Sequence, residues 1–251
     1  MSTSAFRRRQ GEYGFDAPYA VVGMIVGGLI CIAMAIGWAG APIPVVYGPL
    51  WLGLYGLALL AMAGSFIYTT RRGKFIVWAA LIDQLGLRGD ERVLDMGCGR
   101  GLVLLEVARH LDTGKAVGVD LWHAIDQSGN GAAVTRANAE AENVSDRVAL
   151  ETGDMSQLPF DDAEFDVVVS SLALHNIRRV NRRMRAIDEA VRVLRPGGRL
   201  LIADFRHTGS YAERLRERGM QDVTCRNLGW RFWYGGPPWA THLVSATKGS
   251  V

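Results

Sequence analysis

A charge-free stretch near the N-terminus places the strongest constraint on how this chain folds. From Ala17 to Thr70 the sequence has no Asp, Glu, Lys or Arg, and most of the residues are apolar. Pro and Gly at residues 40–44 divide the stretch into two runs, about 19–38 and 45–68, because neither residue continues a helix well. Each run is long enough to cross a hydrocarbon core about 30 Å thick as a helix. We therefore predict a transmembrane hairpin over residues 19–70.

Two other structures would also account for an apolar stretch. A cleaved signal peptide has a shorter apolar core, and a second apolar run does not follow it directly. A buried hairpin of a soluble protein rarely lacks charged side chains over such a length. The transmembrane hairpin is therefore favoured. Small residues four apart, Gly23 with Gly27 and Ala33 with Gly37, predict where its helices approach each other.

Basic clusters on both sides of the hairpin predict its orientation. Arg7, Arg8 and Arg9 precede it, and Arg71, Arg72 and Lys74 follow it, whereas the connecting loop has no charge. Segments rich in Lys and Arg stay on the cytoplasmic side. The pattern predicts a two-pass protein of the cell membrane. Residues 1–18 form a cytoplasmic basic tail, and both termini and the following domain lie in the cytoplasm.

The charge balance and the cysteines exclude several classes of partner. Residues 1–74 carry six basic and two acidic side chains, whereas residues 75–251 carry 22 basic and 23 acidic ones. A nearly neutral domain gives no general argument for nucleic-acid binding, so no nucleic-acid partner is expected. Cys31, Cys98 and Cys225 are too few for a disulfide framework, and no pair has zinc-ligand spacing. We expect reduced thiols and no metal site.

Residues 75–251 alternate short apolar, β-rich runs with helical patterns. Such alternation is typical of an α/β fold, a doubly wound parallel sheet covered on both faces. An amphipathic helix at 74–85 lies in a linker, residues 71–88, that leads to a domain at 89–251. We predict strands at 92–95, 115–120, 147–153, 165–171, 199–204, 223–227 and 243–247, helices at 101–110, 130–142, 181–194 and 211–218, and a Pro-Gly-Gly turn at 196–198.

A glycine-rich loop follows the first predicted strand. Asp95-Met-Gly-Cys-Gly-Arg-Gly101 closes an apolar run and opens a helix. Glycines permit positive φ and let a ligand approach the backbone. The spacing differs from the Gly-x-Gly-x-x-Gly fingerprint of dinucleotide folds, which argues against a nicotinamide-dependent oxidoreductase. Asp95 would also repel a pyrophosphate, whereas it suits a cationic amine.

Acidic residues end the next two predicted strands. Asp120 ends the second strand, where a carboxylate can accept hydrogen bonds from ribose hydroxyls. Asp154 and Met155 follow the third strand, and an acid beside an apolar side chain suits the amino group and the ring face of adenine. Because ligands of open parallel sheets bind beyond the carboxyl ends of the strands, these groups predict one cofactor site.

The order of these motifs resembles a known family. The runs Val93–Gly101, Gly118–Asp120, Gly153–Met155, Leu158–Asp166 and Leu194–Leu200 are similar to the motifs of class I, Rossmann-like S-adenosylmethionine-dependent methyltransferases. They are most similar to the subgroup that methylates quinone precursors, small molecules and lipids. The resemblance covers roughly residues 90–205. It implies a seven-stranded, mostly parallel sheet whose last strand is antiparallel, and S-adenosylmethionine as the cofactor.

The resemblance also implies which residues contact the cofactor. They lie in the glycine loop and at the ends of the second, third and fourth strands. They are Asp95, Met96, Gly97, Cys98, Gly99, Gly101, Asp120, Leu121, Asp154, Met155 and Ser171, the last through nearby backbone.

Two further residues are candidates for catalysis. Methyl transfer needs alignment of the reactants and exclusion of water, and it needs a general base only if the acceptor must lose a proton. His175 lies just beyond the fourth strand and Asp204 ends the fifth. His175 is the stronger candidate, although a histidine at such a place often serves packing alone.

The substrate side is less constrained by the sequence. Trp122 and His123 follow Asp120 and are candidates for binding the acceptor. The connector between the last two strands contains Trp230, Trp233 and Tyr234, which could line an apolar pocket, contact the membrane interface or pack on the sheet edge. Five arginines within residues 178–185 are either a solvated helix face or a site for anionic headgroups.

The motifs and the hairpin together predict a membrane-bound methyltransferase. Its acceptor is expected to be hydrophobic, such as a quinone precursor, an isoprenoid or a lipid. Two alternatives stay open: a methyltransferase of a soluble small molecule, and a non-catalytic membrane scaffold that binds S-adenosylmethionine. The sequence sets neither the methylated atom nor the oligomeric state.

Overall fold

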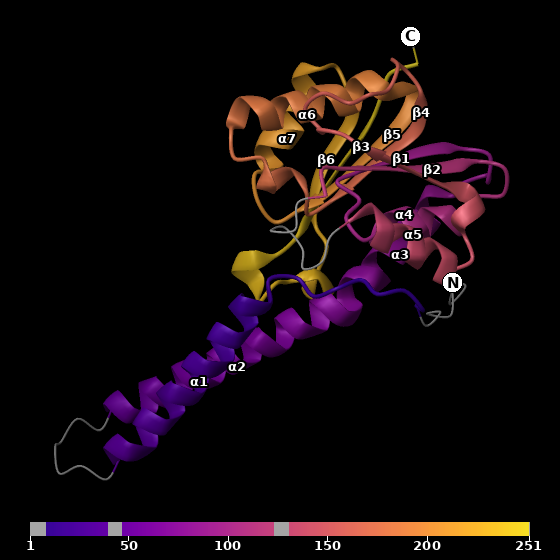
Figure 1. The fold of residues 1–251 in the computed structure, drawn as a ribbon. Helices are drawn as coiled ribbons and strands as arrows, with labels where there is room; N and C mark the ends of the chain where they lie inside the picture. The colour runs from indigo at the N-terminus through magenta and orange to yellow at the C-terminus, as the bar shows by residue number, and fades with distance from the viewer. Residues whose placement is uncertain (1–8, 40–46, 123–130, 251) are drawn as a thin grey trace. The chain divides into compact units, whose positions relative to one another are not determined.

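The computed structural model describes residues 9–39, 47–122 and 131–250. Within this part of the chain, seven strands form one sheet in the order β3-β2-β1-β4-β5-β7-β6 (Figure 1). The pairs among β1 to β5 are parallel, and β7 runs antiparallel between β5 and β6. The strands are β1 (Arg92–Met96), β2 (Lys115–Asp120), β3 (Val148–Thr152), β4 (Phe165–Ser171), β5 (Leu194–Asp204), β6 (Gln221–Asn227) and β7 (His242–Thr247). This topology confirms the predicted fold class.

Helices cover both faces of the sheet (Figure 1). One face carries α3 (Lys74–Leu85), α4 (Leu102–Ala108) and α5 (Ala132–Ala141), and the other carries α6 (Val180–Val193) and α7 (Thr208–Glu217). The central strands are buried on both faces, which explains their nearly continuous apolar runs. In β4, for example, Val167, Val168 and Val169 are all almost fully buried.

The fifth strand is longer than predicted. The Pro-Gly-Gly segment was expected to form a turn before the strand, but β5 begins at Leu194, directly after α6. Leu194 pairs with Phe165, the register then shifts, and the regular pairing resumes at Arg199 with Val167. The N–H of Gly197, where φ is +76°, donates to the carbonyl of Lys248 at 2.8 Å. The N–H of Lys248 donates in turn to the carbonyl of Gly198 at 2.9 Å, so these two hydrogen bonds hold the glycine segment beside the end of β7.

The described chain divides into two units. The sheet unit contains Phe75–Leu228, the N-terminal residues up to Gly14 and the C-terminal residues from Thr241. The hairpin unit contains Phe15–Lys74 and Gly229–Ala240. The connector between β6 and β7 therefore belongs to the hairpin unit, although the sequence places it between two strands.

Two apolar helices, α1 (Pro18–Ala39) and α2 (Tyr47–Tyr68), pack against each other in the hairpin unit. Their closest approach lies at Gly28 and Gly56, where a Cβ on Gly56 would stand 2.7 Å from the carbonyl oxygen of Gly28. The predicted small residues differ in outcome: a Cβ on Gly27 would lie 3.6 Å from the Cδ1 of Leu59 in α2, whereas no heavy atom of the described residues outside their own helix lies within 4 Å of a Cβ on Gly23 or Gly37. A spacing of four marks a helix face but does not say which face meets the partner.

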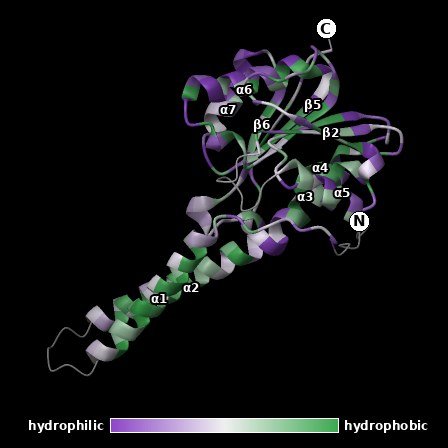
Figure 2. Cartoon of the chain, viewed as in Figure 1, coloured by the Kyte–Doolittle hydropathy of each residue, from purple (hydrophilic) through white to green (hydrophobic). Residues whose placement is uncertain are grey.

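The two helices consist mostly of hydrophobic residues (Figure 2). Each helix has 22 residues, which at 1.5 Å per residue gives about 33 Å. Large side chains such as Ile36, Trp51 and Leu57 are more than half exposed. The two helices meet the length and composition required of candidate membrane spans.

Candidate active site

The glycine loop leaves the end of β1 as a tight turn beside the end of β2. The N–H of Gly97 donates to the carbonyl of Val119 at 2.8 Å, with φ at +75°. A Cβ on Gly97 would lie 2.3 Å from the Cβ of Ala173 and 3.3 Å from the Sδ of Met155. Only glycine fits this position, and its backbone is left open to a ligand.

Asp95 is buried directly under this loop. Its side chain is 2% exposed, and its Oδ2 accepts a hydrogen bond from the N–H of Leu104 at 2.9 Å. Its Oδ1 has no hydrogen-bond partner within the described residues. Burial raises the pKa of Asp95 to about 7, and the nearby charge of Asp120 adds to the shift. A buried carboxylate oxygen without a donor is a ready acceptor for a cationic ligand.

Asp120, at the end of β2, accepts hydrogen bonds from the backbone of the glycine loop and of the segment that follows β2. Its Oδ2 accepts from the N–H of Gly99 at 2.9 Å, and its Oδ1 accepts from the N–H of Trp122 at 2.7 Å. A carboxylate has about four acceptor positions, so a carboxylate at this place suits hydroxyl donors of a ligand. Leu121, the next residue, exposes 44% of its surface. This arrangement fits the predicted contact with ribose hydroxyls.

Asp154 and Met155 lie beyond the end of β3. Met155 approaches Gly97, as predicted for a residue of the cofactor site. Asp154 already accepts from the N–H and the Oγ of Ser156, and it also pairs with Arg182. Burial acts to raise the pKa of Asp154, but these partners outweigh it and hold the pKa below its ordinary value. Asp154 therefore stays ionised, with a competing arginine beside the predicted adenine contact.

Three other predicted cofactor residues lie with their side chains in the core or near it. Met96 is 1% exposed and Cys98 is 6% exposed, so both residues are buried. The Oγ of Ser171 accepts a hydrogen bond from the indole N–H of Trp78 at 2.8 Å. Trp78 in α3 is fully buried, so this helix is anchored at the carboxyl end of β4.

Helix α5 supports the glycine loop from the side, which the sequence did not indicate. The Oγ1 of Thr135 donates to the carbonyl of Gly99 at 2.7 Å, and the Nδ2 of Asn138 donates to the carbonyl of Arg100 at 2.9 Å. Both side chains are buried. Polar residues three apart on the inner face of a helix are the only local sign of such a role.

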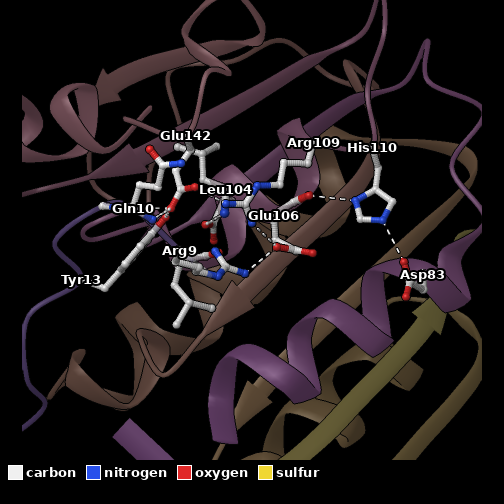
Figure 3. A network of polar contacts seen from close by, with 12 residues as sticks. Arg9, Gln10, Tyr13, Asp83, Leu104, Glu106, Arg109, His110 and Glu142 are labelled. Atoms are coloured by element: carbon white, nitrogen blue, oxygen red, sulfur yellow. Dashed lines mark hydrogen bonds and ion pairs between the residues drawn. The ribbon is translucent and has the colours of Figure 1, made fainter. Parts of the chain in front are cut away.

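An N-terminal strap, residues 9–14, runs over α4 and α5 (Figure 3). Arg9 forms an ion pair with Glu106 at 2.5 Å, and both side chains are about nine-tenths buried. Glu142 accepts from the N–H groups of Gln10 and Gly11 and from the hydroxyl of Tyr13, and it pairs with Arg109. The strap thus fixes the helices that support the glycine loop.

A second polar group lies at the ends of β4 and β5. His175, in a short 3₁₀ turn (Leu174–Asn176), places its Nδ1 2.9 Å from the Oδ1 of Asp204. The N–H of that ring nitrogen is not aligned for a hydrogen bond, and such pairs often tighten only when substrate is bound. Asp204 is fully buried and accepts from the backbone N–H groups of His175 and Phe205. The structure brings the two predicted catalytic residues together.

The predicted substrate residues fall into separate regions. The indole N–H of Trp122 donates to Thr152 at 2.9 Å beside the end of β2, and His123 lies outside the described residues. Trp230, Trp233 and Tyr234 belong to the hairpin unit. Their role in binding an acceptor stays a prediction.

The arginine run at the start of α6 does not form a single solvated face. Arg178, Arg179 and Arg185 are exposed, and Arg182 pairs with Asp154. Arg183 is only 5% exposed and donates to the carbonyl of Ile177 at 2.9 Å. A buried arginine within a basic run has no local sequence signal.

Comparisons with known proteins show what the sheet unit is similar to. A family model described as a methyltransferase domain matches residues 94–202. A solved S-adenosylmethionine-dependent methyltransferase from Aquifex aeolicus covers 67% of this chain and 87% of its own, with a TM-score of 0.53 and 17% identity. The sheet order and these matches show that residues 94–202 are similar to a methyltransferase domain and that the sheet unit has the fold of solved S-adenosylmethionine-dependent methyltransferases.

Two curated relatives also match part of the chain. The chain is 38% identical over 156 residues to the 27-O-demethylrifamycin SV methyltransferase of Amycolatopsis mediterranei. It is 36% identical over 126 residues to the ubiquinone/menaquinone biosynthesis C-methyltransferase UbiE of Roseobacter denitrificans. The matches cover 59% and 50% of this chain, and they span about half of each relative, 53% and 47%.

The cofactor of this domain class is S-adenosylmethionine, and the residues present fit it. The orphaned Oδ1 of Asp95 suits its cationic amine, and the Gly97 turn is a cradle that a Cβ would fill. Asp120 lies beside the glycine loop at the end of β2, where a carboxylate suits ribose hydroxyls.

Proposed function

We propose that this chain is a membrane-anchored methyltransferase that transfers a methyl group from S-adenosylmethionine to a hydrophobic acceptor. A quinone precursor, an isoprenoid or a lipid has the required chemistry. The observation that carries the proposal is the presence, in one chain, of a methyltransferase domain and two exposed apolar helices long enough to span a bilayer.

The residues at the ends of β1 and β2 bind and orient the cofactor in this proposal. Asp95 holds the amine, the Gly97 turn lies against the ligand, and Asp120 binds the ribose. S-adenosylmethionine, when bound, would supply an activated methyl group whose carbon an acceptor can attack in line, with the neutral thioether as the leaving group. The protein contributes proximity, alignment and exclusion of water.

His175 acts on the acceptor as the general base. The Nε2 of the His175 ring would accept the proton that the acceptor loses, while the bound cofactor would supply the methyl group and its sulfur would keep the electrons of the broken bond. Asp204 faces Nδ1 on the other side of that ring and stabilises the imidazolium that forms. His175 also packs against Phe205, with 4.5 Å between ring centroids, which limits the ring's orientation.

The hydrophobic acceptor is supported by two independent observations. UbiE is named for ubiquinone and menaquinone biosynthesis, and another relative of 32% identity is named a 2-phytyl-1,4-β-naphthoquinone methyltransferase. The hairpin would keep the chain at the bilayer, where such acceptors dissolve. The basic residues Arg71 and Arg72 at the end of the hairpin favour a cytoplasmic sheet unit.

Reconstitution tests the proposal directly. Membranes from cells with and without the full chain are incubated with labelled S-adenosylmethionine, and lipids and quinones are searched by mass spectrometry for a gain of one CH₂. The matched control is Gly97→Val, in which the cofactor cradle is filled. A labelled product in the organic extract that is absent from the Gly97→Val sample is the expected result.

A soluble acceptor is the second candidate, and one relative favours it. The Amycolatopsis mediterranei protein is named as a methyltransferase of a rifamycin, which is not a membrane lipid. A labelled product confined to the aqueous fraction would support this candidate. Binding of S-adenosylmethionine by calorimetry without any labelled product would instead support a non-catalytic scaffold.

A further inference from the structure

The connector between β6 and β7, residues 229–240, is held to the hairpin through its own backbone. The Oγ1 of Thr69 donates to the carbonyl of Trp233 at 2.7 Å and approaches that of Arg231 at 3.4 Å. The Oγ of Ser65 donates to the carbonyl of Trp233 at 3.2 Å. Loop carbonyls are usually left to water, so donors supplied by a helix indicate a place where water is scarce.

A π-helical turn, Thr69–Gly73, allows the connector to come this close. A Cβ on Gly73 would stand only 1.8 Å from the carbonyl oxygen of Arg231. No other residue type fits there without moving the connector. Single π-turns inside helices often occur at functional places, because they redirect the side chains around them.

Aromatic side chains of the connector pack on rings of α2. Trp230 stacks on Tyr68 with centroids 5.2 Å apart and planes at 23°. Tyr234 meets Phe66 edge-on, with centroids 4.9 Å apart. The connector is therefore a third part of the hairpin unit, joined to the two helices by ring contacts and hydrogen bonds.

A buried ion pair between Asp16, which precedes α1, and Lys74, which begins α3, is joined to the connector by Tyr234. The Oδ2 of Asp16 accepts from the Nζ of Lys74 at 2.6 Å and from the hydroxyl of Tyr234 at 2.8 Å. Lys74 is 5% exposed. Burial, together with the charge of Asp16, raises the pKa of Tyr234 well above its ordinary value. The hydroxyl of Tyr234 therefore stays protonated at neutral pH and donates to Asp16.

The side chains that stay exposed on this part of the hairpin unit are tryptophans and arginines. Trp230 and Trp239 are 54% and 39% exposed, and Arg231 places its guanidinium 4.8 Å from the centre of the Trp230 ring. Arg71 and Arg72, next to Gly73, are exposed as well. We call these five residues the Trp/Arg collar.

We propose that the Trp/Arg collar is a binding surface for the anionic headgroups of the bilayer. The inference rests on the membrane anchoring proposed above and adds a partner, a lipid surface of negative charge. Tryptophan is enriched where hydrocarbon meets headgroup, and clustered arginines near a membrane helix attract anionic lipid. The exposed apolar side chains of α2, such as Ile67 and Leu57, continue from the collar and supply the hydrocarbon contact.

The alternative role for the connector is a wall of the acceptor site. Its inward rings are occupied by contacts with α2, and its outward residues combine positive charge with indole rings. This combination suits a headgroup layer better than an apolar acceptor, which gains nothing from guanidinium groups. If the connector tryptophans line an acceptor site instead, brominated lipids should not quench their fluorescence in the test below.

Fluorescence quenching by brominated lipids tests the depth of the collar. The full chain is reconstituted in vesicles of phosphatidylcholine and phosphatidylglycerol, brominated either near the headgroups or deep in the acyl chains. The fluorescence of each tryptophan is obtained as the difference between the unaltered chain and the variant that lacks it. The variants are Trp230→Phe and Trp239→Phe for the collar and Trp51→Phe for α2. We expect Trp230 and Trp239 to be quenched by the shallow bromines and Trp51 by lipid bromines at either depth.

The same measurement separates failure of the collar from failure of the anchoring. If Trp51 is quenched but Trp230 and Trp239 are not, the collar proposal is overturned and the anchoring stands. If none of the three is quenched, both are overturned. Because phenylalanine keeps the ring contact with Tyr68, a folding defect is not expected, and binding of S-adenosylmethionine in the same vesicles checks the sheet unit.

Lipid retained on the purified protein tests the charge preference. The full chain is extracted from mixed vesicles in mild detergent, and the ratio of phosphatidylglycerol to phosphatidylcholine is measured by mass spectrometry. Replacing Arg71, Arg72 and Arg231 by Gln should lower this ratio severalfold, whereas Arg216→Gln, an exposed arginine of the sheet unit, should leave it unchanged. An equal ratio in the triple variant and the unaltered protein would show that the arginines do not bind headgroups.

Discussion

Asp95 and Asp204 are both buried carboxylates near the carboxyl ends of parallel strands, yet they face different partners. Asp95, at β1, accepts one backbone N–H from Leu104 and keeps an oxygen without a donor among the described residues. Asp204, at β5, accepts the backbone N–H groups of His175 and Phe205 and faces the ring of His175. The Oδ1 of Asp95 can therefore accept a hydrogen bond from a ligand, whereas Asp204 orients the side chain of His175.

The difference divides the carboxyl edge of the sheet into two halves. In the half formed by β1 and β2, carboxylates and glycines fix the shape of a loop, which should govern the affinity for S-adenosylmethionine. In the half formed by β4 and β5, a carboxylate holds a titratable ring, which should govern turnover. Variants in the two halves should therefore change different constants.

The largest effect is expected from His175→Gln. Loss of a general base typically lowers the rate by about 10²–10⁴-fold. Turnover of the acceptor should fall by this amount, while calorimetry should give an unchanged affinity for S-adenosylmethionine. His110→Gln is the matched control, because His110 lies in the same unit but bonds to Asp83 and the carbonyl of Glu106. Nearly full turnover in His175→Gln would show that the acceptor does not give its proton to this ring.

Gly97→Ala should produce the next largest effect, and on affinity alone. The new Cβ would stand 2.3 Å from the Cβ of Ala173 and would have to tolerate φ at +75°. We expect the affinity for S-adenosylmethionine to fall about 100-fold, since each tenfold corresponds to about 1.4 kcal/mol. Gly219→Ala is the control, with φ at +74° and no neighbour within 4 Å of the Cβ. If both variants bind equally well, the cradle is not part of the cofactor site.

The pH dependence of cofactor binding should reveal the unpaired oxygen of Asp95. Burial raises the pKa of this carboxyl to about 7, so below that pH the unliganded protein holds it protonated. Only the ionised form attracts a cationic amine, so the affinity should weaken about tenfold for each pH unit below the pKa. Calorimetry between pH 5.5 and 8.5 measures the slope. Asp95→Asn should bind more weakly and without this slope, whereas a slope that persists in the variant would place the titrating group elsewhere.

The cofactor half was largely predictable because its signals are local. Apolar β-rich runs fixed the strands, and Asp95, Gly97 and Asp120 each lie within two residues of a strand end. The seven-stranded, mostly parallel sheet with an antiparallel last strand followed from the family resemblance and is confirmed, whereas the order of the strands was not predicted. His175 and Asp204 were identified in the same way, from their places after two strands.

Contacts between distant segments were not predictable. The hydrogen bond of Trp78 to Ser171 and the burial of Arg183 depend on which helix face meets the sheet. The helix contact at Gly28 and Gly56 was missed because several small residues share a suitable spacing. In each case the residue type permits the contact, but only the tertiary packing selects it.

The smallest effect is expected from the N-terminal strap, which supports the cofactor half alone. Glu142→Gln weakens the acceptor for Gln10, Gly11 and Tyr13 and removes the charge opposite Arg109 (Figure 3). Loss of hydrogen bonds to a charged group should lower the free energy of unfolding by about 1–3 kcal/mol. Because α5 also holds the carbonyls of Gly99 and Arg100, the affinity for S-adenosylmethionine should fall a few-fold.

The matched control for the strap is Glu140→Gln, an exposed residue of the same helix. Denaturant titration gives the stability of both variants, and calorimetry gives the affinity. The pH profile of turnover should stay the same in Glu142→Gln, because the strap does not touch His175. A shifted profile would mean that the two halves of the sheet edge are coupled through α5, and the division between affinity and turnover would then have to be abandoned.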